Sequence, residues 1–305
     1  MPANFPEIWL GRIIQNLDNS DVAPFLNGIA EIAASVVQIN QGQLSEQNKI
    51  YVPSTEFEVD VLINNTTYPI AVQTYADGTI EITLDKYQTK VVTLSDDQII
   101  GASYDKIDVV TKSLVRSIMS SKYKKAIHSI APAAVTVDTP VMAATGGAAA
   151  LTDPSGRKRL TYEDLVAFKD ACDKAGMAEE GRRLVLCTNH WNDLLLDRKN
   201  FGNQLVDYAK GKPAPFISDF ELHKYPVMPI YTSLKVKKAY GAIIEAGDTV
   251  ASVCFVKEKI GKKTGLTKQY FAEAKNNPAT QTNDLSYRHY FIAVPYQNKH
   301  IAAIV

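Results

Sequence analysis

A long amphipathic helix predicted near the middle of the chain restricts the fold most. Between residues 104 and 131, apolar side chains recur at spacings of three and four, the period of a helix with one buried face. They are Ile107, Val110, Leu114, Ile118, Ala126, Ile127 and Ile130. At 1.5 Å per residue this helix would be on the order of 40 Å long, and Pro132 would follow its last turns. The polar side carries Lys112, Arg116, Lys122 and Lys124. Only the apolar side therefore needs a sheet or another helix beneath it.

The segment before this helix predicts a meander of three or four strands over residues 48–100. The stretch "FEVDVLI" alternates apolar and polar residues, and "YPIAVQT" follows a polar turn at Asn64 and Asn65. The stretch "TYADGTIEITLDKY" then predicts a β-hairpin. Its turn would be Asp77-Gly78, because Gly supplies positive φ and Asp tolerates it.

The apolar face of this hairpin is narrow. It consists of Ile80, Ile82 and Leu84, which alternate with polar residues. An isolated hairpin is at best marginally stable in water. Either the rest of the same chain or another chain must therefore cover the face.

The second half of the chain predicts an α/β unit over residues 161–255. Thr161 with Asp164 predicts a helix start, and Gly176 predicts its end. "RLVLC" predicts a buried strand and "TNHWNDLLL" a second helix. Further strands are predicted near Val135–Val137 and in "PVMPIYTS", "YGAIIEAG", "TVASVCFV", "LTKQYFAEA", "RHYFIAVPY" and "HIAAIV".

Composition excludes several classes of function. Lys plus Arg equals Asp plus Glu at 33 each, which argues against a sequence-reading DNA-binding protein. No apolar run reaches the roughly 18 residues needed to span a bilayer, and the first residues do not predict a signal peptide. We therefore expect no membrane association. Cysteines 172, 187 and 254 predict free thiols in a reducing compartment.

The most enzyme-like cluster is "CTNHWND", with Cys187, His190 and Asp193. A cysteine at a strand end with a histidine near a helix start could form a nucleophile and base, and His190 with Asp193 could bind a metal only with distant ligands. The structural interpretation is favoured, because Cys187 lies in an apolar strand and Thr188 or Asn189 would cap the helix.

The basic stretch "EKIGKKTG", residues 258–265, could contact phosphate, although a solvated loop is favoured. No phosphate-loop, dinucleotide-binding, zinc-protease or hydrolase motif is present. We expect no catalytic residue, no cofactor and no metal site.

The order of these segments resembles the major capsid protein of tailed bacteriophages, with the Hong Kong 97-like fold. "PEIWLGRIIQNL" resembles the N-terminal arm, and "LDKYQTKVVTLSDDQIIGASYDKIDVV" resembles the descent from an extended loop into the spine helix. "ASVCFVKEKIGKKTGLTKQYFAEA" with "LSYRHYFIAVPYQNKHIAAIV" resembles the C-terminal strands. The resemblance covers nearly the whole chain. The sequence itself most resembles coat proteins of phages that infect Bacteroidota.

The resemblance implies an α+β fold with an N-terminal arm, extended β-hairpin loop, spine helix, peripheral domain and axial domain. The implied division is 1–45 for the arm, 46–103 for the extended loop, 104–160 for the spine helix and first part of the peripheral domain, 161–255 for the axial domain and 256–305 for the rest of the peripheral domain. Residues 133–160 would thus be peripheral.

The implied function is self-assembly into an icosahedral shell of hexamers and pentamers that encloses double-stranded DNA. The resemblance implies a separate scaffold protein, a portal protein and a decoration protein as partners. The implied location is the virion, or the host cytoplasm during assembly. Predicted inter-subunit contacts are Trp9, Asp77, Gly78, Ile80, Ile82, Leu84 and Tyr87. Lys86, Lys90, Asn276 and Asn277 do not match the family's cross-linking motif, so no cross-link is predicted.

Other interpretations remain open at this point. The same fold also forms cellular nanocompartment shells that enclose an enzyme. A Cys187–His190 enzyme and a tail or baseplate protein are the alternatives from other classes.

Overall fold

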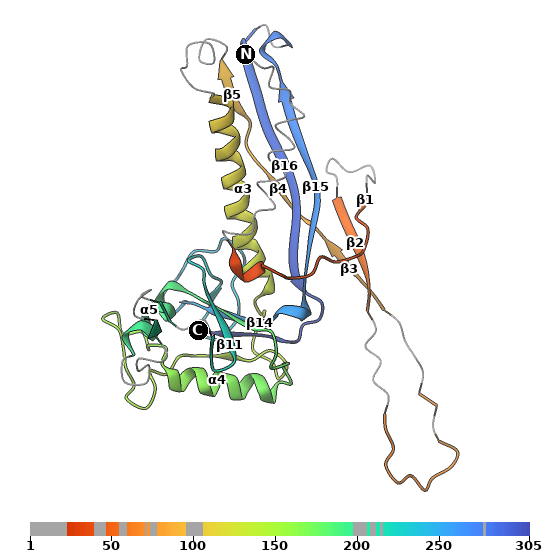
Figure 1. The fold of residues 1–305 in the computed structure, drawn as a ribbon, viewed down its shortest axis with the longest axis vertical. Coiled ribbons are helices and arrows are strands. Elements are labelled where there is room, and N and C mark those ends of the chain that lie inside the picture. Colours follow the sequence, from red (N-terminus) through yellow and green to blue (C-terminus); the bar gives the residue numbers. More distant parts are fainter. Residues whose placement is uncertain are drawn as a thin grey trace.

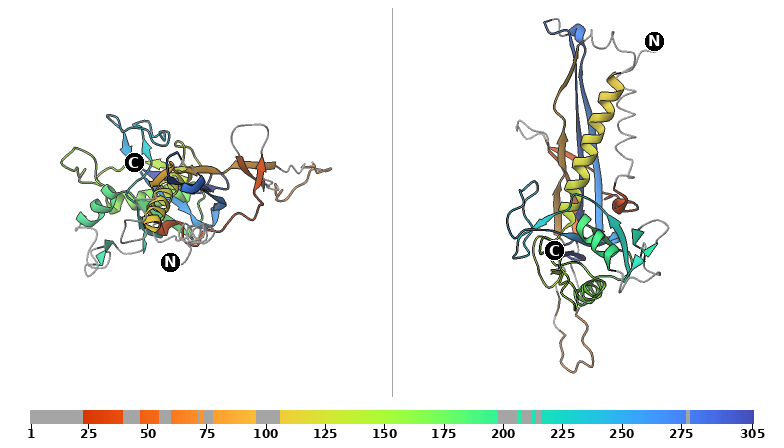
Figure 2. Two further views of the ribbon diagram at one scale, coloured as in Figure 1. Left: turned by 90° about the horizontal axis from the view of Figure 1, so that it is seen from above. Right: turned by 90° about the vertical axis from the view of Figure 1, so that its left-hand side faces the viewer.

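The computed structural model describes residues 23–39, 47–54, 60–70, 72–73, 78–95, 106–197, 206–207, 212–213, 216–276 and 279–305. An elongated body of one helix and long strands stands above a compact body (Figure 1). A narrow ribbon of strands projects to one side of both bodies (Figure 1), and the view from above shows the same separation (Figure 2, left). The C-terminal end lies in the compact body (Figure 1).

The elongated body consists of helix α3, Lys106–Ile130, packed along an antiparallel sheet. Its strands are β15 (Ile260–Ala272), β16 (Thr282–Pro295), β4 (Asp85–Gln88) and β5 (Val92–Ser95). β15 pairs along one edge of β16, and β4 and β5 pair with successive parts of the other edge. The predicted helix is therefore confirmed. The sheet that its apolar face requires is built from strands on both sides of the helix in the sequence, β4 and β5 before it and β15 and β16 after it.

One residue on the predicted polar side of this helix is not exposed. Lys122 is buried, and its ammonium group lies 4.8 Å from the ring centroid of Phe291 on β16. A cation over an aromatic face is attracted to the π-electrons of the ring. The polar face is thus narrower than the sequence pattern predicts.

The compact body contains a six-stranded sheet in the order β10-β11-β7-β14-β17-β6. Their bounds are Phe216–Ile217, Phe220–Lys224, Arg182–Leu186, Ser252–Val256, Ile301–Ile304 and Val141–Met142, in that order. Helices α4 (Tyr162–Lys174) and α5 (Thr188–Leu196) pack on it. Thr161 caps α4 in a capping box with Asp164, and Gly176 has a φ of +68° after its end, as the sequence predicts.

The remaining elements are short or belong to the ribbon. They are η2 (Pro24–Leu26), β1 (Val37–Ile39), β2 (Gln47–Ser54), β3 (Gly78–Thr83), β8 (Val206–Asp207), β9 (Lys212–Pro213), β12 (Ile230–Tyr231), β13 (Thr249–Val250), η3 (Lys257–Lys259) and η4 (Ala274–Asn276). The ribbon has the order β1-β2-β3. Arg183 on β7 fixes η2 to the compact body, because its Nη1 donates to the carbonyl oxygens of Phe25 and Asn27 at 3.0 and 2.6 Å.

Several predicted strands are wrong. Residues 60–63 and 68–70 are not strands, and neither are Val135–Val137 or residues 240–247. The basic stretch 258–265 is largely strand β15 instead of a loop. Alternation of apolar residues indicates two faces, but a strand also needs a neighbouring strand for its backbone hydrogen bonds, and within the described part of the chain these segments pair with no strand.

The predicted domain boundaries do not follow the sheets. β6 comes from the 104–160 range and β17 from the 256–305 range, yet both lie in one sheet with β7 and β14. Among the described residues, no helix is long and apolar enough to cross a membrane. All three cysteines are free and buried.

Candidate assembly interface

The ribbon shows how far the chain covers the apolar face of β3 by itself. Ile82 pairs with Ile50 and Ile80 with Val52 across the ribbon. Leu84, at the end nearest the elongated body, is only 3% exposed, Ile82 is half-buried and Ile80 is 37% exposed. Leu84 is covered because it packs with residues of β16 in one apolar cluster. The chain therefore covers the inner end of the stripe and leaves the outer end open.

The predicted contact residues fall into different environments. Leu84 lies in the core of its own chain and has almost no surface left for another subunit. Tyr87 is half-buried against the core beneath α3, and this burial raises the pKa of its hydroxyl. Gly78 begins β3 opposite Ser54 and does not close a tight hairpin, so that turn prediction is wrong. Trp9 and Asp77 lie outside the described residues.

The described residues between β2 and β3, 60–70 and 72–73, form a loop that lies away from both bodies (Figure 1). The backbone N–H of Asp60 donates to Oε1 of Gln73 at 3.0 Å, which ties the two sides of the loop together. A turn at Asn64 and Asn65 reverses the chain, with Asn64 at a φ of +54° and Asn65 bonded to both N–H and C=O of Thr67. This polar turn was predicted.

The loop displays apolar side chains in water. More than half of the surface is exposed for each of Val61, Leu62, Ile63, Tyr68, Ile70 and Val72. A concentration of exposed apolar side chains marks an interaction surface. Sequence reasoning missed this set because the alternation in "FEVDVLI" was interpreted as a strand, although the apolar residues themselves were visible.

A second exposed apolar segment lies in the compact body between β12 and β13. Its exposed members are Leu234, Val236, Tyr240, Ile243 and Ile244. The base of this segment is fixed to the end of α3, because Nζ of Lys237 donates to the carbonyl oxygens of His128, at 2.9 Å, and Ala131. Burial, with a smaller contribution from Lys125, lowers the pKa of Lys237 to about 8.

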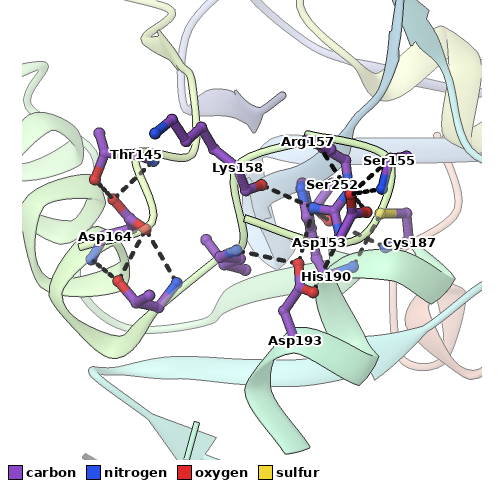
Figure 3. A network of polar contacts seen from close by, with 12 residues as sticks. Thr145, Asp153, Ser155, Arg157, Lys158, Asp164, Cys187, His190, Asp193 and Ser252 are labelled. Atoms are coloured by element: carbon purple, nitrogen blue, oxygen red, sulfur yellow. Dashed lines mark hydrogen bonds and ion pairs between the residues drawn. The ribbon is translucent and has the colours of Figure 1, made fainter. Parts of the chain in front are cut away.

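The cluster "CTNHWND" belongs to a polar network at the start of α5 (Figure 3). The Asp193 carboxylate accepts two hydrogen bonds from the Arg157 guanidinium, at 2.8 and 3.0 Å, and one from the backbone N–H of Leu160 at 3.1 Å. Arg157 also contacts Asp153 at 3.2 Å. These bonds fix the segment before α4 against α5, so the network has a clear structural role.

The geometry does not pair Cys187 with His190 as nucleophile and base. The His190 ring instead forms a hydrogen bond with Ser252, with Nδ1 and Oγ 2.8 Å apart. The contact of His190 with Sγ of Cys187 is made by its backbone N–H, at 3.5 Å, and not by its ring. Burial raises the pKa of the Cys187 thiol, and burial with Arg157 lowers the pKa of His190 to about 4. Cys187 itself caps α5, so the predicted cap at Thr188 or Asn189 is wrong. No group of three metal-ligating side chains occurs among the described residues.

Comparison with known proteins gives one family. A family model described as "Phage capsid protein" matches residues 74–304. A search of curated proteins found no match.

Solved structures share the fold at low sequence identity. The capsid of a native GTA particle has a TM-score of 0.60 at 9% identity, covering 92% of this chain and 88% of that one. The capsid of the cyanophage P-SCSP1u has a TM-score of 0.57 at 12% identity, covering 92% and 86%. The capsid of Ralstonia phage GP4 has a TM-score of 0.55 at 9% identity, covering 91% and 84%.

Proposed function

Because the chain belongs to the phage capsid protein family, we propose that it self-assembles into an icosahedral shell of hexamers and pentamers that encloses double-stranded DNA. Family membership and the Hong Kong 97-like α+β fold identify a major capsid protein of a bacteriophage, a viral structural protein. The proposal adds the architecture of the shell, its content and the absence of enzymatic activity. A host among the Bacteroidota is part of the proposal and is supported only by the resemblance of the sequence stretches to coat proteins of such phages.

The exposed apolar loop between β2 and β3 carries this proposal. The backbone of the loop lies away from both bodies of its own subunit (Figure 1), and its apolar side chains are exposed. Fully burying an aliphatic side chain stabilises an interface by roughly 1.5–3 kcal/mol. Such a loop is unfavourable on an isolated subunit and favourable where a neighbouring subunit covers it. Gly78, Ile80 and Ile82 would extend that contact towards the body.

We keep the domain names that the resemblance implies and assign the observed strands to them. The 46–103 segment is the extended loop, α3 is the spine helix, and β15 with β16 is the core of the peripheral domain. The six-stranded sheet, including β6 and β17, is the axial domain. A separate scaffold protein, a portal protein and a decoration protein remain proposed partners, and the virion is the proposed location.

The test compares the wild-type chain with a loop variant, Val61→Ser/Ile63→Ser/Val72→Ser. We expect closed particles from wild type, with or without a scaffold, by negative-stain imaging. The variant should lose at least about tenfold in particle yield, since one tenfold step needs only about 1.4 kcal/mol. Its melting temperature should be unchanged, because these side chains are exposed in the subunit.

The matched control is Val135→Ser/Val137→Ser/Val166→Ser, which removes exposed apolar side chains from elsewhere in the chain. Equal loss of particles in both variants would overturn the role of the loop. Open rings or tubes from wild type would favour a tail or baseplate protein. Small closed shells filled with a cargo enzyme would favour a nanocompartment.

A further inference from the structure

A basic groove runs between α3 and the end of β11, outside the interface described above. Its volume is about 530 Å³. The lining residues on α3 include Lys112, Arg116, Ser120 and Lys124, and β11 contributes Lys224. No Asp or Glu lines it, although the chain as a whole has equal numbers of acidic and basic residues.

The polar α3 residues of the groove are spaced at intervals of four, and all of them except Ser120 are cationic. With a rise of 1.5 Å per residue, successive members of this row are about 6 Å apart along the helix. Double-stranded DNA carries one negative charge per roughly 1.7 Å of its axis. A row with this spacing lies opposite several phosphates whatever the base sequence.

Three cations of the groove, Arg116, Lys124 and Lys224, are available to a ligand. Within the described part of the chain, Arg116, Lys124 and Lys224 form no ion pair. Lys224 lies over the Trp191 ring, with Nζ 5.8 Å from the centroid, a contact that holds the side chain without neutralising it.

The apolar side chains at the base of the groove are buried within their own chain. Val115, Met119 and Tyr225 are buried, and the Tyr225 ring contacts Phe25 edge-on at 5.3 Å. An acidic amphipathic peptide would need an extended apolar surface here, whereas the exposed apolar side chains of the lining are the two neighbours Pro226 and Val227. The groove therefore carries positive charge, and its exposed apolar side chains are confined to Pro226 and Val227.

We propose that this groove binds the phosphate backbone of double-stranded DNA without sequence preference. The inference rests on the proposed function, in which the shell encloses DNA, and it names the surface that would face the genome. Binding of this kind is electrostatic, so it weakens steeply as salt concentration rises.

The test is the affinity of the full chain for a fluorescent DNA duplex, measured by anisotropy between about 50 and 200 mM salt. The variant is Arg116→Gln/Lys124→Gln/Lys224→Gln. Losing these contacts should reduce the slope of log affinity against log salt by roughly 2–3 and weaken binding on the order of 100-fold near 0.1 M salt. The control, Lys158→Gln/Lys235→Gln/Lys299→Gln, removes the same charge away from the groove and should bind like wild type.

Equal weakening in the control would overturn the proposal, because net charge would then explain binding. Unchanged binding by the groove variant would overturn it too. Loss of polyglutamate binding with DNA binding unchanged would assign the groove to an acidic polypeptide instead. Imaging separates the DNA-binding proposal from the proposed function. A groove variant that forms shells and binds DNA like wild type would refute only DNA binding by the groove. Wild-type protein without closed particles refutes the proposed function.

Discussion

Strands β7 and β3 have similar lengths and opposite surroundings. All five residues of β7, Arg182–Leu186, are buried, whereas β3, Gly78–Thr83, has only one residue that is even half-buried. β7 has a strand on each side and helices packed on its sheet, while β3 has β2 on one side. The apolar residues of β7 are explained by the subunit itself. Those at the outer end of β3 are left uncovered by the described residues of the subunit.

The largest expected effect lies in the compact body. Phe168→Ala removes a fully buried ring that packs on Phe220, with centroids 5.6 Å apart. A cavity of this kind should lower the free energy of unfolding by about 3–5 kcal/mol. Chemical denaturation of the subunit measures it, with Val166→Ala on the exposed side of α4 as the control. A change below about 1 kcal/mol for Phe168→Ala would contradict the buried core on which the comparison depends.

An intermediate effect is expected within the apolar stripe of Ile80, Ile82 and Leu84, whose two ends should respond differently to substitution. Leu84→Ala should cost the subunit about 2–3 kcal/mol because Leu84 is buried in its own chain. Ile80→Ser should change subunit stability by less than about 0.5 kcal/mol and reduce particle yield. Paired denaturation and imaging measurements decide the matter. If Ile80→Ser lowered subunit stability as much as Leu84→Ala, the outer end of the stripe would belong to the subunit core.

The smallest effect is a pH dependence that arises from His190 in the compact body. Burial and Arg157 lower the pKa of His190 to about 4, below the ordinary value of 6.5. The unfolded chain therefore binds the proton first, so stability should fall as pH drops from about 6.5 to about 4, with a slope of at most about 1.4 kcal/mol per pH unit from this residue. The loop carries no such group among its described residues.

His190→Gln removes the titrating group and keeps a side chain that can bond Ser252. Denaturation curves of this variant at several pH values should show a shallower dependence than wild type. An unchanged slope would assign the acid sensitivity to other buried groups, of which His289 is the first candidate, because burial lowers its pKa to about 3.

Features set by neighbours in sequence were predictable. The period of α3 and the Thr161–Asp164 capping box are local patterns, and both are confirmed. The strand prediction for "FEVDVLI" was wrong because alternation cannot reveal whether a partner strand exists. The contact between Arg157 and Asp193 joins residues 36 positions apart, a separation at which no sequence pattern indicates proximity. The inter-subunit assignments came from a family resemblance and stay predictions.

The position of β16 and β17 has a consequence for synthesis. β16 lies between β15 on one side and β4 and β5 on the other, and β17 lies between β14 and β6. Both sheets thus lack an interior strand until residues 282–304 have been made. Domains usually fold one after another from the N-terminus during translation. Here neither body is complete before that point, so the apolar loop between β2 and β3 is made long before either body of its own subunit can close.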